Sequence, residues 1–60
     1  MSDRAVNAVF QALFTLSDIR FLLRRTAPGH DLDEEERKQA AASIVKVKRH
    51  IAILEEELIR

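Results

Sequence analysis

Residues 3–26 read DRAVNAVFQALFTLSDIRFLLRRT, and this stretch decides the fold. Its apolar residues recur every three or four positions, which is the spacing of an α-helix. On an ideal helix, the polar residues form a strip of only about 80°, and most of the remaining circumference is apolar. A surface helix with one partner shows an apolar stripe of little more than about 100°. The pattern therefore predicts a helix over about 3–26 with neighbours on two sides.

The apolar arc of this helix contains two ridges. Aliphatic residues form the first ridge, and aromatic residues form the second: Val6, Val9, Leu13, Leu16 and Leu23, and then Phe10, Phe14 and Phe21. Thr15 belongs to the polar strip, and Leu22 falls outside the arc on the ideal wheel. We expect the aliphatic ridge to close against a second helix of the same chain, and the aromatic ridge to face another chain.

A turn is expected over about 27–32, because the only proline and the only glycine are adjacent there, at Pro28 and Gly29. Proline disfavours helical geometry at the residue before it, and glycine permits the reversal. Either Asp31 or Asp33 then serves as the N-cap of a second helix, since each has a glutamate three residues later, as in a capping box. This second helix is predicted over about 33–59.

The second helix carries a seam in which apolar residues alternate by four and three, as in a coiled coil. The seam consists of Ala40, Ile44, Val47, Ile51, Leu54 and Leu58. Ile44, Val47, Ile51 and Leu54 are expected to receive the aliphatic ridge of the first helix. A flanking line of Ala41, Val45, Ala52 and Ile59 widens the stripe toward a further neighbour. Ile53 and His50 fall on the polar face, where His50 is expected to be solvated.

These patterns predict an all-α protein with one domain over residues 1–60, an antiparallel two-helix hairpin that dimerises into a four-helix bundle. A chain of this size buries only about 60% of its unfolded surface, and the absence of cysteine excludes disulfide support, which leaves self-association as the expected route to stability. The residues predicted to contact the second chain are Phe10, Phe14, Phe21, Val45, Ala52 and Ile59.

Opposite charges are expected to orient the hairpin. Arg4 should approach Glu55–Glu57, and Arg24 and Arg25 should approach Glu34–Glu36. Because such pairs are exposed, each is worth well under about 1 kcal/mol and selects an orientation more than it stabilises one.

The overall charge offers no general attraction to nucleic acid or to an anionic membrane, since ten basic residues balance ten acidic ones. Asn7, Gln11, Asp18 and Arg20 interrupt the first apolar segment, so the sequence predicts neither a transmembrane helix nor a membrane partner. A signal peptide is not expected either, and a cytoplasmic protein is the default.

No catalytic apparatus is recognisable in the sequence. No nucleophile stands beside a base in a known motif, and the phosphate-binding glycine patterns are absent. The carboxylates of Glu34–Glu36 point about 100° apart on a helix and cannot converge on a metal ion. The sequence therefore predicts no enzyme, no cofactor and no metal site.

The expected function is that of a small non-enzymatic interaction module, an adaptor or regulator acting as a homodimer, with a protein partner as a further possibility. One alternative is an RNA- or DNA-binding regulator that uses Lys46 and Arg49, which share a helix face. Another is a helical-hairpin chaperone subunit of a hetero-complex. The expected architecture is similar to that of the plasmid copy-control RNA-binding proteins typified by Rop, and the similarity lies in the architecture alone.

Overall fold

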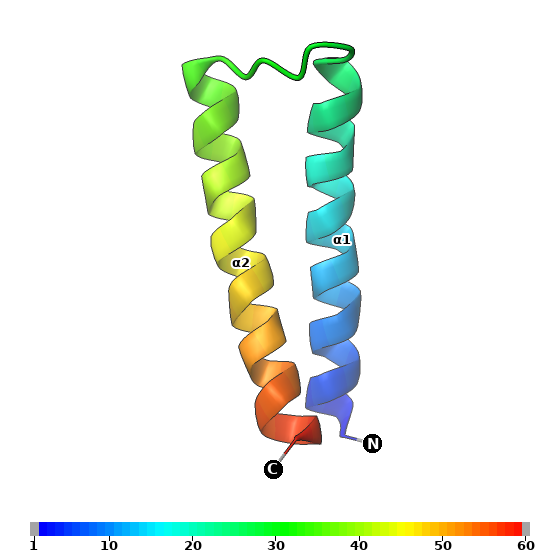
Figure 1. Ribbon diagram of the computed structural model, residues 1–60. Coiled ribbons are helices and arrows are strands. Elements are labelled where there is room, and N and C mark those ends of the chain that lie inside the picture. The colour runs from blue at the N-terminus through cyan, green and yellow to red at the C-terminus, as the bar shows by residue number, and fades with distance from the viewer. Residues whose placement is uncertain (1, 60) are drawn as a thin grey trace.

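Residues 2–59 form an antiparallel helical hairpin in the computed structural model (Figure 1). Helix α1 spans Asp3–Arg25 and helix α2 spans Glu34–Leu58. The hairpin measures 40 by 16 by 14 Å, and the start of α1 lies beside the end of α2 (Figure 1). The predicted all-α hairpin is confirmed, and each helix end lies within one residue of its expected position.

Side-chain caps explain where the two helices begin. The hydroxyl of Ser2 accepts a hydrogen bond from the backbone N–H of Ala5 at 3.1 Å and caps α1. In α2 the Asp33 carboxylate accepts from the N–H of Glu36 at 2.8 Å, and the Glu36 carboxylate accepts from the N–H of Asp33 at 3.0 Å. This reciprocal pair is a capping box, and it selects Asp33 over Asp31 as the N-cap.

Replacing Asp33 by alanine is expected to lower the free energy of unfolding by about 1 kcal/mol, because one N-terminal N–H of α2 loses its acceptor. Urea unfolding followed by circular dichroism measures this loss. Asp31→Ala is the matched control, with the same change of charge two residues away, and it should shift stability by a few tenths of a kcal/mol at most. Equal losses for both variants would contradict the role of Asp33.

The chain reverses between the helices with His30 in the left-handed region of backbone space, at φ 58°. Its N–H donates to the carbonyl oxygen of Thr26 at 2.8 Å, which satisfies one of the last carbonyls of α1. The left-handed position of the turn thus falls on His30, the residue after Gly29.

A line of α1 residues that begins with alanines closes the hairpin, and the predicted closing ridge of α1 was wrong because all five of its residues are exposed. On α2, Val47 and Leu54 are half-buried as predicted, whereas Ile44 and Ile51 are exposed. The buried residues among 2–59 are Ala5, Ala8, Thr15 and Leu22, all from α1, with Ala12 and Ile19 half-buried between them. On α2 the half-buried residues of the facing line are Glu36, Ala40, Ser43, Val47, His50, Leu54 and Glu57. Each line alternates by three and four, as packed antiparallel helices require. Ile53 is also half-buried, not exposed on the polar face.

Thr15 and Leu22 were misplaced because an ideal helix drifts about 20° per seven residues relative to a packed, supercoiled one. Ala8, Thr15 and Leu22 are seven residues apart, and this drift spreads them over about 40° on the ideal wheel although they form one line in the hairpin. The hydroxyl of Thr15 donates to the carbonyl oxygen of Gln11 at 2.9 Å, which allows it to be buried.

Ion pairs at both ends fix the register of the two helices, and the prediction is confirmed for Arg4 and Arg25, whereas Arg24 forms no ion pair among residues 2–59. Arg4 contacts Glu56 at 3.0 Å and Glu57 at 3.1 Å, and Arg25 contacts Glu36 at 3.2 Å. Hydrogen bonds to Glu56 and Glu57 raise the pKa of Arg4 above its usual value. The residue numbers of the Arg4–Glu57 and Arg25–Glu36 pairs have the same sum, 61, so the register is uniform along the length of the hairpin.

Candidate interaction face

Large apolar side chains on one side of the hairpin are left uncovered. We call the two rows of buried and half-buried residues that face each other the closing lines. Each of the uncovered residues follows a closing-line residue by one position, and these uncovered residues recur every seven positions. They are Val9, Leu16 and Leu23 of α1, and Ile44, Ile51 and Leu58 of α2. Their exposed fractions lie between 40% and 57%. In an antiparallel pair, equivalent positions of the two helices fall on the same side of the hairpin. We call this six-residue surface the open face.

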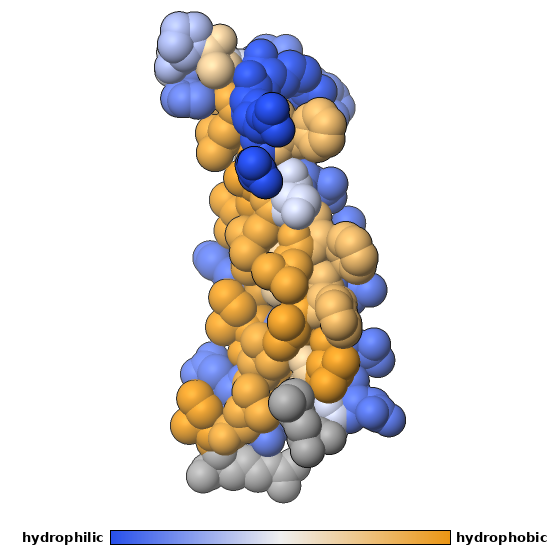
Figure 2. Space-filling model, turned by 90° about the vertical axis from the view of Figure 1, so that its right-hand side faces the viewer, coloured by the Kyte–Doolittle hydropathy of each residue, from blue (hydrophilic) through white to orange (hydrophobic). Residues whose placement is uncertain are grey.

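Further apolar residues extend the open face around α1. Val6 and Leu13 alternate by three and four with the α1 residues of the open face, and both are exposed. Figure 2 shows apolar side chains in a nearly continuous band along the length of the molecule. A patch of this extent is typical of an interaction site, because soluble monomers rarely leave so long an apolar surface in water.

The sequence-predicted contact residues are also exposed. The phenylalanines lie further around α1 than the open face, with exposed fractions of 55% for Phe10, 65% for Phe14 and 77% for Phe21. On α2, Val45, Ala52 and Ile59 are exposed and each follows a residue of the open face by one position, which places them about 100° further around the helix. The hairpin leaves these six residues available, and their contact with another chain stays a prediction.

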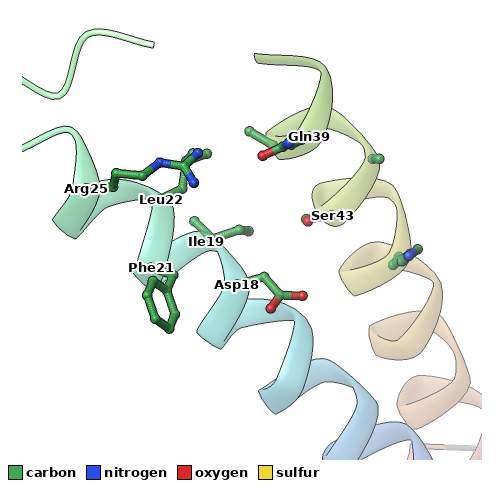
Figure 3. Close-up of a pocket in the computed structure, with 10 residues that line it drawn as sticks. Asp18, Ile19, Phe21, Leu22, Arg25, Gln39 and Ser43 are labelled. Atoms are coloured by element: carbon green, nitrogen blue, oxygen red, sulfur yellow. The ribbon is translucent and has the colours of Figure 1, made fainter. Parts of the chain in front are cut away.

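The opposite side of the hairpin carries polar residues and a cleft of about 410 Å³ between the helices near the turn (Figure 3). Asp18 and Arg25 of α1 and Gln39 and Ser43 of α2 reach into it, and Phe21 lies at its outer edge. Of the two predicted nucleic-acid contacts, Lys46 lines this cleft, whereas Arg49 is exposed on α2 outside it.

His50 lies in the helix–helix seam, which corrects its expected place on the solvated surface. Its side chain is half-buried, and its Nδ1 atom is buried without a hydrogen-bond partner among residues 2–59. The seven-residue spacing of Ser43, His50 and Glu57 places it in the α2 line that faces α1. This spacing was the signal available in the sequence.

His50→Leu is expected to raise the free energy of unfolding by about 1–2 kcal/mol, because a buried polar atom without a partner is removed and the apolar contact is kept. His50→Gln, which retains a polar group at this position, should give no such gain. Thermal and urea unfolding measure the difference. A loss of stability in His50→Leu would show that Nδ1 has a partner in solution.

Within residues 2–59, no three histidine, aspartate or glutamate side chains are placed so that they could hold a metal ion together.

By length and composition, helix α1 could cross a membrane, and 22% of its most apolar window is buried in the hairpin. Core helices of soluble proteins and N-terminal signal sequences meet the same criterion, so this property by itself assigns no membrane role.

Comparison with known proteins adds no relative to this picture: no family model, no curated protein and no solved structure matches the chain.

Proposed function

We propose that this protein is a non-enzymatic interaction module that acts as a homodimer, in which two hairpins join their open faces into a four-helix bundle. The observation that carries the proposal is that each helix has a row of three exposed aliphatic residues spaced seven positions apart. A second helix packs along rows with this spacing, because seven residues complete two turns of a supercoiled helix. The dimer would serve as a small cytoplasmic adaptor or regulator.

The size of the open face supports this proposal. The open face runs along one side of the hairpin, and the whole of that side, 40 by 16 Å, has a projected area of about 640 Å² before its corrugation is counted. Stable protein–protein interfaces bury about 800 Å² per partner, so the two areas are comparable. In a square bundle, each helix has two neighbours about 90° apart, and the closing line and the open face of α1 are offset in this way.

The seam predicted on α2 also fits the centre of such a bundle. Ala40, Val47 and Leu54 belong to the closing line, and Ile44, Ile51 and Leu58 belong to the open face. Three of the six residues therefore contact α1 of the same chain, and the other three would contact the second copy. A single hairpin leaves half of this stripe in water, and a second copy would cover it.

Sedimentation equilibrium over a range of concentrations tests the proposal directly. The expected result is a dimer at micromolar concentration, with a midpoint of thermal unfolding that rises with protein concentration. A stable folded monomer would overturn it. A single-chain species that sediments only with lipid vesicles or with another protein would point instead to a membrane role or to the hetero-complex chaperone subunit.

A second candidate function is nucleic-acid binding, and the cleft gives it a specific observation. Lys46, Arg25 and the exposed Phe21 line the same cleft together with Asp18, and because Arg25 is paired with Glu36, Lys46 is the cation that the cleft offers beside an aromatic ring. Such a combination suits single-stranded RNA or DNA, through phosphate contacts and base stacking. Binding of labelled oligonucleotides at low salt, compared with that of the Lys46→Glu, Arg49→Glu double variant, tests it. Equal binding by both proteins would contradict this candidate.

A further inference from the structure

We infer that the two copies associate with their turns at opposite ends, and that Arg37 of each copy pairs with Glu55 of the other. This inference rests on the proposed function and specifies its geometry. Two arrangements would keep all neighbouring helices antiparallel when the open faces meet. With turns at opposite ends, α1 packs on α1 and α2 on α2. With turns at the same end, each α1 packs on the α2 of the other copy.

The positions of the charged residues on α2 favour the first arrangement. Arg37 lies seven residues before Ile44 and continues the open-face row, while Glu55 lies on the solvent side of that row. Both are exposed. They stand nine residues before and nine residues after residue 46, the middle of α2. When two α2 helices cross at their middles in opposite directions, Arg37 of one copy is therefore level with Glu55 of the other, and two-fold symmetry forms this pair twice.

The apolar residues fit the same arrangement. Ala41 and Ile51 are also equidistant from residue 46, so a small side chain of one α2 meets a large one of the other. Leu13 lies one residue before and Leu16 two residues after residue 14, the middle of α1, so they would pack on each other across an α1–α1 contact centred within half a residue of that middle. The hairpin register places the middles of both helices at the same level to within one residue, so both contacts can form together.

The arrangement with turns at the same end lacks these complementary contacts. There the hairpin register sets Arg37 level with Arg24 of the other copy and within one residue of Leu23, and it sets Glu55 level with Val6. Arg37 and Glu55 would then each lie beside an aliphatic side chain without an opposite charge. The arrangement with turns at opposite ends also sets one charge, Lys48, level with the aliphatic Ile44, so the Arg37–Glu55 pair is what distinguishes the two arrangements. Arg20, which lies beside Leu16 and Leu23 on α1, would stand about one helical turn from Arg37 of the other copy, and like charges at this distance repel.

Charge reversal tests the pairing. Arg37→Glu and Glu55→Arg are each expected to raise the dimer dissociation constant at low salt about tenfold, because two attractive pairs become repulsive. The double variant should return to within about threefold of the unchanged protein. Both reversals improve the interaction of these side chains with the α2 dipole, so weakened helix formation would not explain weaker association. Arg49→Glu, the same charge change away from the open face, is the matched control.

Disulfide trapping gives an independent readout of orientation, since the chain has no cysteine of its own. A mixture of Leu13→Cys and Leu16→Cys proteins, one carrying a mass tag, should form the mixed disulfide if the turns lie at opposite ends. A mixture of Val9→Cys and Ile51→Cys proteins should form it if the turns lie at the same end.

The outcomes separate the two proposals. A dimer that shows reciprocal rescue by the double variant, and trapping through residues 13 and 16, supports the inferred orientation. A dimer in which the single reversals have no effect, in which the double variant remains weak, or in which residues 9 and 51 are trapped overturns the orientation while homodimerisation stands. A monomeric unchanged protein overturns homodimerisation itself, and the orientation with it.

Discussion

Leu16→Glu is expected to convert the dimer into a monomer, with a dissociation constant raised at least about a hundredfold. Leu16 lies in the middle of the open face with 47% of its surface exposed in the single hairpin. In the proposed bundle its side chain is enclosed between helices, and an unpaired carboxylate there costs several kcal/mol. Glutamate forms helices almost as well as leucine, so the hairpin itself should be little affected. Sedimentation equilibrium measures the change.

Phe14→Glu is the informative companion to this variant. Phe14 is more exposed than Leu16, at 65%, and lies two positions away on the same helix. If the open face is the interface, Phe14 stays outside its centre and the variant remains dimeric. If the aromatic ridge predicted from the sequence faces the second chain, Phe14→Glu dissociates the dimer and Leu16→Glu does not. The pair of variants thus decides between the two surfaces of α1.

The sequence was sufficient to predict the two helices, the turn and the ion pairs, because each depends on local chemistry. The capping box of Asp33 and Glu36 and the adjacent Pro28 and Gly29 set the element boundaries within one residue. The ends of the hairpin follow from charge, since Arg4 and Arg25 each have a single run of glutamates level with them.

The closing surface could not be predicted in the same way, because α1 is apolar over most of its circumference. Hydrophobicity alone favours the aliphatic ridge, which holds larger side chains than Ala5 and Ala8. Close approach of two helices depends instead on small residues, and the alanines recur at the spacing that close packing needs. The small side chains of Ala5, Ala8, Ala12 and Thr15 alternate by three and four, and this run was the available signal for the closing line, which Ile19 and Leu22 complete.

Leu22→Ala is expected to remove most of the stability of the hairpin. Leu22, at 6% exposed, is the most fully buried large side chain among residues 2–59. Truncating a buried leucine costs about 2–5 kcal/mol, and a domain of this size has about 3–5 kcal/mol from its core. The variant should unfold without a cooperative transition, or at much lower urea concentration, when followed by circular dichroism at a fixed protein concentration.

Phe21→Ala is the control for this variant, since the larger neighbouring side chain is 77% exposed. Loss of an exposed ring should change the free energy of unfolding by no more than about 0.5 kcal/mol. If Phe21→Ala proves as destabilising as Leu22→Ala, Phe21 is covered in solution by something outside the hairpin. Because the hairpin buries so little of its own apolar surface, each large exposed residue whose truncation destabilises the protein locates a contact made by another molecule. A scan of such truncations would therefore map the interface whether the molecule that covers it is a second copy or a different protein.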